Sequence, residues 1–202
     1  DFKMVYYNSD GRESSMCGNG GRCILQFAYD LGVIRDEYKF MAIDGDHLGR
    51  VSTDEVSLKM MNAAKAETLE TDFILNTGSP HYIRPKTNID DQDLINEAKA
   101  VRYSDRFKEE GINFNYLEVI GENALAVRTY ERGVEDETYS CGTGVTAAGL
   151  VHAQREHLPK GELKVKTKGG NLKVSFEATD SGFKNVWLTG TATFVFEGKI
   201  TL

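Results

Sequence analysis

The sequence carries the same four-residue pattern twice, Cys-Gly-x-Gly, at residues 17–20 and again at residues 141–144. Each copy runs directly into a segment whose apolar residues recur at helical spacing. A cysteine just ahead of a helix lies at the positive end of the helix dipole, beside free backbone N–H groups, where a thiol pKa falls and anions bind. The repetition therefore predicts a duplicated fold that holds two acid/base thiols, Cys17 and Cys141.

The patterns around the two cysteines favour an α+β fold with two pseudo-symmetric halves. Helices are expected over residues 20–31, 91–101 and 144–157, and the first and last of these are expected to be core helices. We expect each half to be a mostly antiparallel sheet or barrel wrapped round a central helix headed by a Cys-Gly-x-Gly motif. The expected strands are 1–8, 38–43, 48–53, 55–61, 72–77, 82–85, 112–120, 124–130, 162–168, 171–177 and 184–196, the last broken near Gly190.

A polar, alanine-rich stretch at residues 62–70 suggests a boundary between the halves. The N-terminal half would comprise residues 1–66 plus 194–202, the C-terminal half residues 67–193, and the active site would lie in the cleft between them. The chain opens on a strand pattern already under way, without an initiator methionine. We therefore expect an N-terminal piece to be missing from it, which leaves the first half incomplete and the activity of this chain in doubt.

Composition narrows the class of partner and the compartment. A net charge of −7 argues against nucleic acid or an anionic membrane as the main partner, and no apolar run approaches the ~20 residues of a membrane span. Three cysteines without disulfide-framework density indicate free thiols in a reducing cytoplasm. The histidines and cysteines lack paired ligand spacing, so we expect no metal site, and Cys23 is expected to pack in the core.

Two opposed thiols can act on one carbon from its two faces. One thiolate removes a proton and the other thiol returns one to the far face, which inverts the stereochemistry. The two sites should titrate as a coupled pair, because two thiolates would repel each other. Backbone N–H groups at both helix starts can hold a carboxylate and stabilise the charge that develops on it. With no pyridoxal lysine motif and no metal cluster in the sequence, the reaction is expected to need no cofactor.

Residues 16–23 and 140–144 closely resemble the two signatures of the diaminopimelate epimerase family. Further segments stand in the family's order, at residues 7–11, 78–81, 111–114, 127–133 and 195–198, so the resemblance covers essentially the whole chain. It implies interconversion of LL- and meso-diaminopimelate without a cofactor, in lysine and peptidoglycan precursor synthesis. It also implies a small-molecule substrate and, since members are often dimers, a homodimer.

The resemblance also implies roles for individual residues. Cys17 and Cys141 match the acid/base thiols, and His81 and Glu131 match a polar pair beside the reacting centre, where Glu131 contacts the substrate amine. Ser79 stands where the family usually has asparagine; it is shorter and offers one donor, so a weaker contact or a water in the gap is expected. Asn8, Asn113 and Arg132 match the positions that hold the distal amino-acid group of the substrate. The backbone N–H groups of Gly18, Asn19, Gly142 and Thr143 match those that hold its α-carboxylate.

Other functions remain open at this point. The nearest is another two-cysteine racemase, such as one acting on proline or hydroxyproline, although that branch often has histidine where Asn19 stands and lacks the Glu-Arg-Gly context of residues 131–133. A thiol-disulfide redox protein is an alternative of a different class, in which Cys17 and Cys141 would cycle through a disulfide. We interpret such a disulfide as an inactivating side reaction. A non-catalytic interaction domain is a third class.

Overall fold

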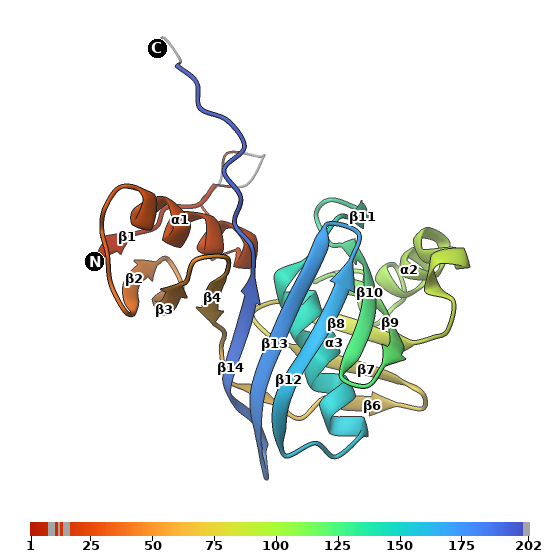
Figure 1. Ribbon diagram of the computed structural model, residues 1–202. Helices are drawn as coiled ribbons and strands as arrows, with labels where there is room; N and C mark the ends of the chain where they lie inside the picture. Colours follow the sequence, from red (N-terminus) through yellow and green to blue (C-terminus); the bar gives the residue numbers. More distant parts are fainter. Residues whose placement is uncertain (8–10, 12, 14–16, 200–202) are drawn as a thin grey trace.

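The structure is a computed structural model that describes residues 1–7, 11, 13 and 17–199. Among these residues, fourteen strands form one sheet in the order β1-β2-β3-β4-β14-β13-β12-β10-β9-β8-β7-β6, with β11 beside β10 and β5 beside β14 (Figure 1). The pairings β1–β2, β8–β9 and β10–β12 are parallel, and the other neighbours are antiparallel. The expected α+β class is confirmed.

The element bounds follow the expected ones closely in the middle of the chain. The helices are α1 (Gly18–Asp30), α2 (Leu94–Arg102) and α3 (Gly142–Arg155), with a short 3-10 turn at Ile89–Asp91. The strands are β1 (Phe2–Lys3), β2 (Tyr38–Ala42), β3 (Gly45–Val51), β4 (Val56–Lys59), β5 (Ala63–Ala64), β6 (Glu67–Leu69), β7 (Asp72–Asn76), β8 (Pro80–Pro85), β9 (Asn113–Gly121), β10 (Ala124–Glu131), β11 (Asp136–Thr138), β12 (Lys160–Thr167), β13 (Gly170–Thr179) and β14 (Gly182–Gly190).

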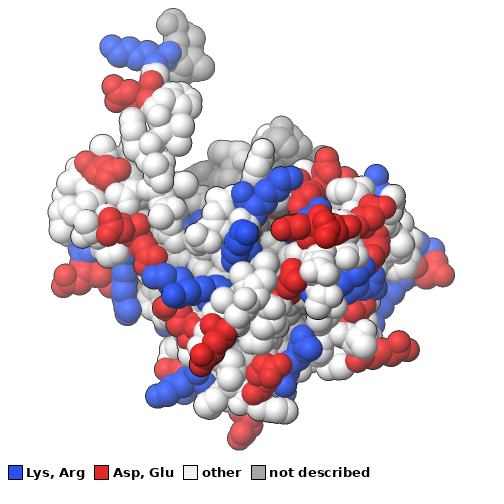
Figure 2. Space-filling model, turned by 45° about the vertical axis from the view of Figure 1, so that its right-hand side comes forward, with Lys and Arg blue, Asp and Glu red and all other residues white. Residues whose placement is uncertain are grey.

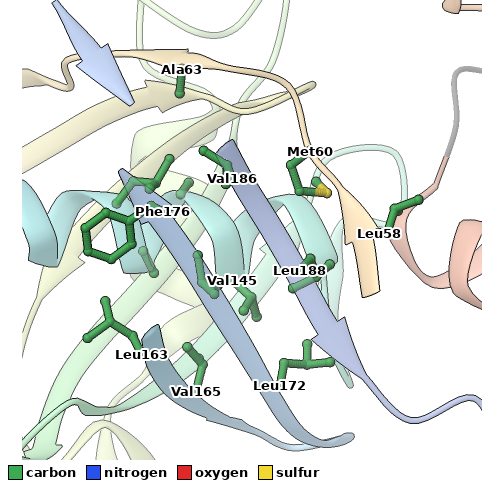
Figure 3. Packing of buried hydrophobic residues seen from close by; sticks show 14 of the residues in the cluster. Leu58, Met60, Ala63, Val145, Leu163, Val165, Leu172, Phe176, Val186 and Leu188 are labelled. Atoms are coloured by element: carbon green, nitrogen blue, oxygen red, sulfur yellow. The ribbon is translucent and has the colours of Figure 1, made fainter. Parts of the chain in front are cut away.

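Helix α3 is a core helix, as expected. Strands β7 to β10 and β12 to β14 surround it, and Figure 3 shows side chains of β12, β13 and β14 that pack around it. Small residues let the sheet come close, since a Cβ added to Gly149 would lie 3.2 Å from Cβ of Val174. Val145, Leu150 and Val151 are completely buried. Because every face of α3 meets a neighbour, its start is held firmly in place.

Helix α1 is covered on one face only, so the expectation that it is wrapped by sheet is wrong. Leu25 is fully buried against β3 and β4, whereas Phe27 is 60% exposed and Leu31 is 66% exposed. Cys23 is also exposed, which corrects its expected core packing. The buried positions of α1 recur at 18, 21, 22, 25 and 28, and position 23 falls on the opposite side of that stripe.

Three expected segments differ from the structure. Of the described residues in the expected strand 1–8, only Phe2–Lys3 form a strand. Residues 62–70 are not a plain linker, because β5 pairs with β14 and β6 pairs with β7. The final strand ends at Gly190, and residues 191–199 leave the body without forming a helix or strand (Figure 1). Phe196 is 79% exposed in this tail. The expected strand beyond Gly190 is therefore wrong here, because a strand needs a hydrogen-bonding partner as well as an alternating sequence.

The largest apolar cluster joins the two predicted halves. Strand β4 of the first half pairs with β14 of the second, and Leu58 stands opposite Leu188. A smaller cluster lies under α2, around Tyr82, Phe114 and Tyr116. On the face drawn in Figure 2, acidic and basic side chains are interspersed. Of the helices that the structure describes, none has the length and apolar character needed to cross a membrane.

Candidate active site

Helices α1 and α3 meet end to end at their N-termini. A Cβ added to Gly142 would lie 3.4 Å from Cα of Gly18, and one added to Gly18 would lie 3.5 Å from Cα of Gly142. The residue ahead of each helix is the motif cysteine, in extended backbone conformation and without a side-chain capping bond. The first glycine of each motif therefore serves the approach of the two helix starts, which brings Cys17 and Cys141 to one place.

Both cysteines line a cavity of about 250 Å³. Most of the site residues predicted from sequence line it as well; Asn8 lies outside the described residues, and His81 is fully buried behind Ser79 and Thr143. The lining residues are Tyr6, Cys17, Gly18, Asn19, Gly78, Ser79, Asn113, Glu131, Arg132, Ser140, Cys141, Gly142 and Thr143.

The pKa of the Cys141 thiol is raised to about 12, first by burial and then by the neighbouring carboxylate of Glu131. The hydroxyl of Thr143, with Oγ1 3.3 Å from Sγ, and the backbone N–H of Gly144 act in the opposite direction, and Cys17 raises the pKa slightly further. For this cysteine the expectation of a lowered pKa at a helix start is wrong, because burial outweighs the dipole. Cys141 therefore holds its proton at neutral pH.

Tyr6 is a site residue that sequence reasoning missed. It lines the same cavity as Cys17. The charge of Cys17 raises the pKa of Tyr6, and burial and the charge of Glu131 add to the shift. In sequence Tyr6 only continues an alternating strand pattern, which carries no sign of this role.

His81 belongs to a hydrogen-bonded group behind the cavity wall. Its Nε2 lies 2.9 Å from the hydroxyl oxygens of both Ser79 and Thr143, and its Nδ1 lies 3.1 Å from Nδ2 of Asn115. Burial lowers the pKa of His81 to about 3, with a further contribution from the charge of Arg132. The imidazole is therefore neutral at physiological pH and acts through the two hydroxyls.

Two asparagine side chains are largely occupied by the protein itself. Asn113 accepts the backbone N–H of Arg132 at 2.9 Å and donates to Pro80 O at 3.0 Å and Ser79 Oγ at 3.3 Å. What remains for a ligand is one lone pair on its Oδ1. Asn19 donates to Ser140 O at 3.1 Å, across the gap between the two cysteine segments.

The charged pair at residues 131 and 132 lies at the end of β10. Glu131 accepts the hydroxyl of Thr138 at 2.5 Å, which fixes its carboxylate beside Cys141. The guanidinium of Arg132 donates to Glu110 O at 2.7 Å and still lines the cavity. Among the described residues, no group of three or more potential ligands lies together in a way that would hold a metal ion.

Solved structures share this fold. The phenazine biosynthesis protein of the PhzF family from Bacillus anthracis has a TM-score of 0.78 at 15% identity, over 99% of this chain and 80% of that one. A probable proline racemase from Agrobacterium radiobacter K84 has a TM-score of 0.70 at 13% identity, over 99% of this chain and 72% of that one. At these identities the likeness establishes the fold alone. Relatives of 35–44% identity, which are epimerases, show that this chain is an isomerase of the epimerase class.

The family model described as Diaminopimelate epimerase matches residues 73–195. Diaminopimelate epimerase from Flavobacterium psychrophilum is 44% identical over 99% of this chain and 78% of its own length. Those from Aquifex aeolicus and Chlorobaculum tepidum are 35% and 37% identical over all of this chain, and 75% and 81% of their own lengths. The chain belongs to the diaminopimelate epimerase family, as the sequence motifs indicated.

Proposed function

We propose that this chain interconverts LL- and meso-diaminopimelate by moving a proton between the substrate Cα and its two motif cysteines. One observation carries the proposal: the glycine contact between α1 and α3 brings Cys17 and Cys141 to one cavity from opposite helices. A carbon placed between the two sulfurs presents one face to each. Inversion at that carbon is the reaction that such a pair supports.

The resting protonation state gives each thiol a role. Cys141 holds its proton because its pKa is raised, so it is the acid, and the role of base is assigned to Cys17 on the opposite helix. The Cys17 thiolate takes the proton from Cα, and the C–H electron pair passes into the carboxylate. The opposite face of Cα then takes the proton of Cys141. The products are the inverted substrate, a Cys17 thiol and a Cys141 thiolate, so charge and protons balance without a cofactor.

The two helix starts would hold the substrate α-carboxylate. The first helical hydrogen bonds are donated by Gly21 and Val145, which leaves the preceding N–H groups of each helix without backbone partners. Those at Gly18, Asn19, Gly142 and Thr143 lie at the cavity and are therefore assigned to the carboxylate and to the charge that develops on it. Two helix dipoles act on the same group.

A second, distal headgroup distinguishes diaminopimelate from a simple amino acid. Arg132 offers a guanidinium for its carboxylate, and the free lone pair of Asn113 can accept from its ammonium group. The hydroxyl of Ser79 and the side chain of Asn8 are assigned to the same end, and the carboxylate of Glu131 to the α-ammonium group. A proline or hydroxyproline racemase would leave Arg132 without a substrate partner, so the diaminopimelate assignment is favoured.

Substrate turnover tests the proposal directly. Purified protein is incubated with LL-diaminopimelate, and the stereoisomers are resolved by chiral chromatography, with L-proline and trans-4-hydroxy-L-proline in parallel reactions. We expect meso-diaminopimelate to accumulate to equilibrium and both imino acids to remain unchanged. Faster inversion of proline would favour the racemase alternative, and no inversion of diaminopimelate would refute the proposal.

We also propose how the chain is divided, where the protein works and what it binds. Residues 1–66 with 194–202 and residues 67–193 are proposed as the two halves of the protein, with the cysteine cavity between them. Its three cysteines are free, which supports a reducing cytoplasm. Net negative charge supports a small-molecule partner rather than nucleic acid. A homodimer rests on the family resemblance, and light scattering after size-exclusion chromatography measures it.

A further inference from the structure

Asn115 is a completely buried amide on β9 that no sequence motif singles out. Its Nδ2 donates to the backbone carbonyl of Tyr82 at 3.1 Å, and its Oδ1 accepts the hydroxyl of Thr129 at 2.8 Å. Because a carbonyl oxygen can only accept, the amide nitrogen must face Tyr82. The orientation of the amide group is therefore fixed, and its second N–H faces Nδ1 of His81 at 3.1 Å.

This contact decides which ring nitrogen of His81 carries the proton. A neutral imidazole has one donor and one acceptor nitrogen, and Nδ1 must be the acceptor because Asn115 donates to it. The proton is therefore on Nε2. His81 has no exposed surface on which to gain a second proton, and the nearby positive charge of Arg132 opposes one. The ring is a fixed donor towards the cavity wall.

The hydroxyls of Ser79 and Thr143 lie between this donor and Cys141. Their oxygens are 3.0 Å apart, and each is 2.9 Å from Nε2 of His81. Ser79 also accepts from Nδ2 of Asn113. If Nε2 were an acceptor, one of the two hydroxyls would have to donate its hydrogen bond to the ring. As a donor, Nε2 fills the second lone pair of Ser79, whose first is taken by Asn113, so the Ser79 hydroxyl donates to Thr143. The Thr143 hydroxyl then donates to the sulfur of Cys141, 3.3 Å away.

We infer that Asn115 is a positioning residue that holds His81 as the Nε2–H tautomer. Through that ring and the hydroxyls of Ser79 and Thr143, Asn115 directs a hydrogen-bond donor to the sulfur of Cys141. The donor stabilises the Cys141 thiolate that turnover creates, against the burial that opposes it. The inference rests on the proposed function, in which Cys141 gives up its proton.

The surroundings of the group agree with this role. The second motif glycine, Gly144, lies against it, since a Cβ there would be 2.5 Å from Oδ1 of Asn115 and 3.1 Å from Cε1 of His81. The titratable groups that face Cys141 are Glu131 and Cys17, and both oppose a thiolate. The groups that favour a thiolate are the backbone N–H of Gly144 and the hydroxyl of Thr143, and the hydroxyl is the one whose direction His81 sets.

Nitrogen-15 NMR of histidine-labelled protein reads the tautomer directly, and a His81→Gln variant assigns the signal. The shifts and proton couplings of the two ring nitrogens show which one is protonated. We expect the proton on Nε2, with no titration between about pH 5 and 9. A proton on Nδ1, or a titration within that range, would overturn the inference.

Alkylation of Cys141 tests the effect on the sulfur. In a Cys17→Ser/Cys23→Ser background it is the remaining cysteine of three, and its rate with iodoacetamide at about pH 8 follows its thiolate fraction. Asn115→Asp places an acceptor against Nδ1, moves the ring proton there and makes Nε2 compete for a hydroxyl proton. We expect an about tenfold slower alkylation, the effect of one hydrogen bond to a charged group.

Thr129→Val is the matched control, because it removes the hydrogen bond on the other side of the same amide. The tautomer and alkylation rate should stay unchanged in this variant, although the free energy of unfolding falls. Thr143→Val removes the last donor without touching Asn115 and should slow alkylation by a similar factor, so it serves if Asn115→Asp fails to fold. Unchanged alkylation in Thr143→Val would overturn the inference.

Neither measurement uses the substrate, so the two proposals can fail separately. If His81 and Cys141 behave as stated but diaminopimelate is not inverted, the proposed function fails while the positioning of the sulfur stands. If diaminopimelate is inverted while the His81 proton is on Nδ1, the inference fails alone.

Discussion

Adding one methyl group at the contact between the two helix starts should weaken catalysis more than folding. In Gly142→Ala, the new Cβ would lie 2.9 Å from Cδ2 of Leu188 and 3.4 Å from Cα of Gly18. Carbon atoms prefer a separation of about 3.5–4.0 Å, so the Leu188 methyl must retreat and the backbone of α1 must give by a few tenths of an ångström. That backbone carries Cys17, and its displacement widens the gap between the thiols.

The size of the effect follows from the displacement. A misplacement of about 1 Å costs about 100-fold in rate, so a shift of roughly half that size predicts a tenfold loss in kcat/KM. Overpacking costs about 1–3 kcal/mol, partly offset by the better helix propensity of alanine. The free energy of unfolding should therefore fall by only about 1–2 kcal/mol.

The assay compares kcat/KM for diaminopimelate inversion with urea unfolding in the same preparations. Gly20→Ala is the control, since its methyl meets the mobile end of Met4, with Cε at 3.1 Å, and leaves the helix contact intact. That variant should stay within about threefold of the wild type, because a flexible side chain can move aside. Wild-type kcat/KM in Gly142→Ala would refute the close approach of the helices as the basis of the site.

Three further predictions concern stability and oxidation. The folded pKa of His81 is lowered to about 3, so between that pH and its ordinary 6.5 the unfolded chain binds a proton that the folded protein does not. The free energy of unfolding should therefore decrease as the pH is lowered from 6.5 to about 3, and His81→Gln should flatten this slope. A slope unchanged in His81→Gln would contradict this. Arg84→Leu should lower the free energy of urea unfolding by about 2 kcal/mol, because the Asp72 carboxylate then keeps only its hydrogen bond from the Tyr82 hydroxyl. Tyr82→Phe should lower it by about 1 kcal/mol, because both hydrogen bonds from Arg84 remain. Equal losses in the two variants would contradict this prediction. After exposure to oxidant, a thiol reductant should restore inversion, and equal turnover with and without reductant would argue against a Cys17–Cys141 disulfide as an inactivating reaction.

The parts of the fold that the sequence predicted are those with local signals. Helix α3 follows from a run of small apolar residues after Cys141, and turn residues in the sequence mark the ends of most strands correctly. The exposure of Phe27 was not predictable, because an amphipathic pattern does not say how many strands will cover a helix. The tail after Gly190 alternates like a strand, yet a strand also requires a partner edge that sequence does not supply.

The candidate site shows the same division. The motif predicted the position of Cys141 at the start of its helix. The pKa of Cys141 is raised by burial and by the charge of Glu131, and both effects arise only when distant segments pack together in the tertiary fold. Asn115 and Tyr6 were missed for a related reason. Asn115 contacts His81, 34 residues away in sequence, and Tyr6 lines a cavity formed by distant segments of the chain. An isolated asparagine or tyrosine has no local mark of such a position.

The central claim is that Cys17 and Cys141 act as base and acid on opposite faces of one carbon. Its most direct test follows deuterium incorporation at Cα of diaminopimelate in deuterated water, with inversion measured in the same samples, for wild-type protein and for Cys17→Ala and Cys141→Ala. We predict that the wild type inverts with solvent deuterium incorporated into the product and that each single variant abolishes inversion. Wild-type inversion rates in either variant would contradict the account.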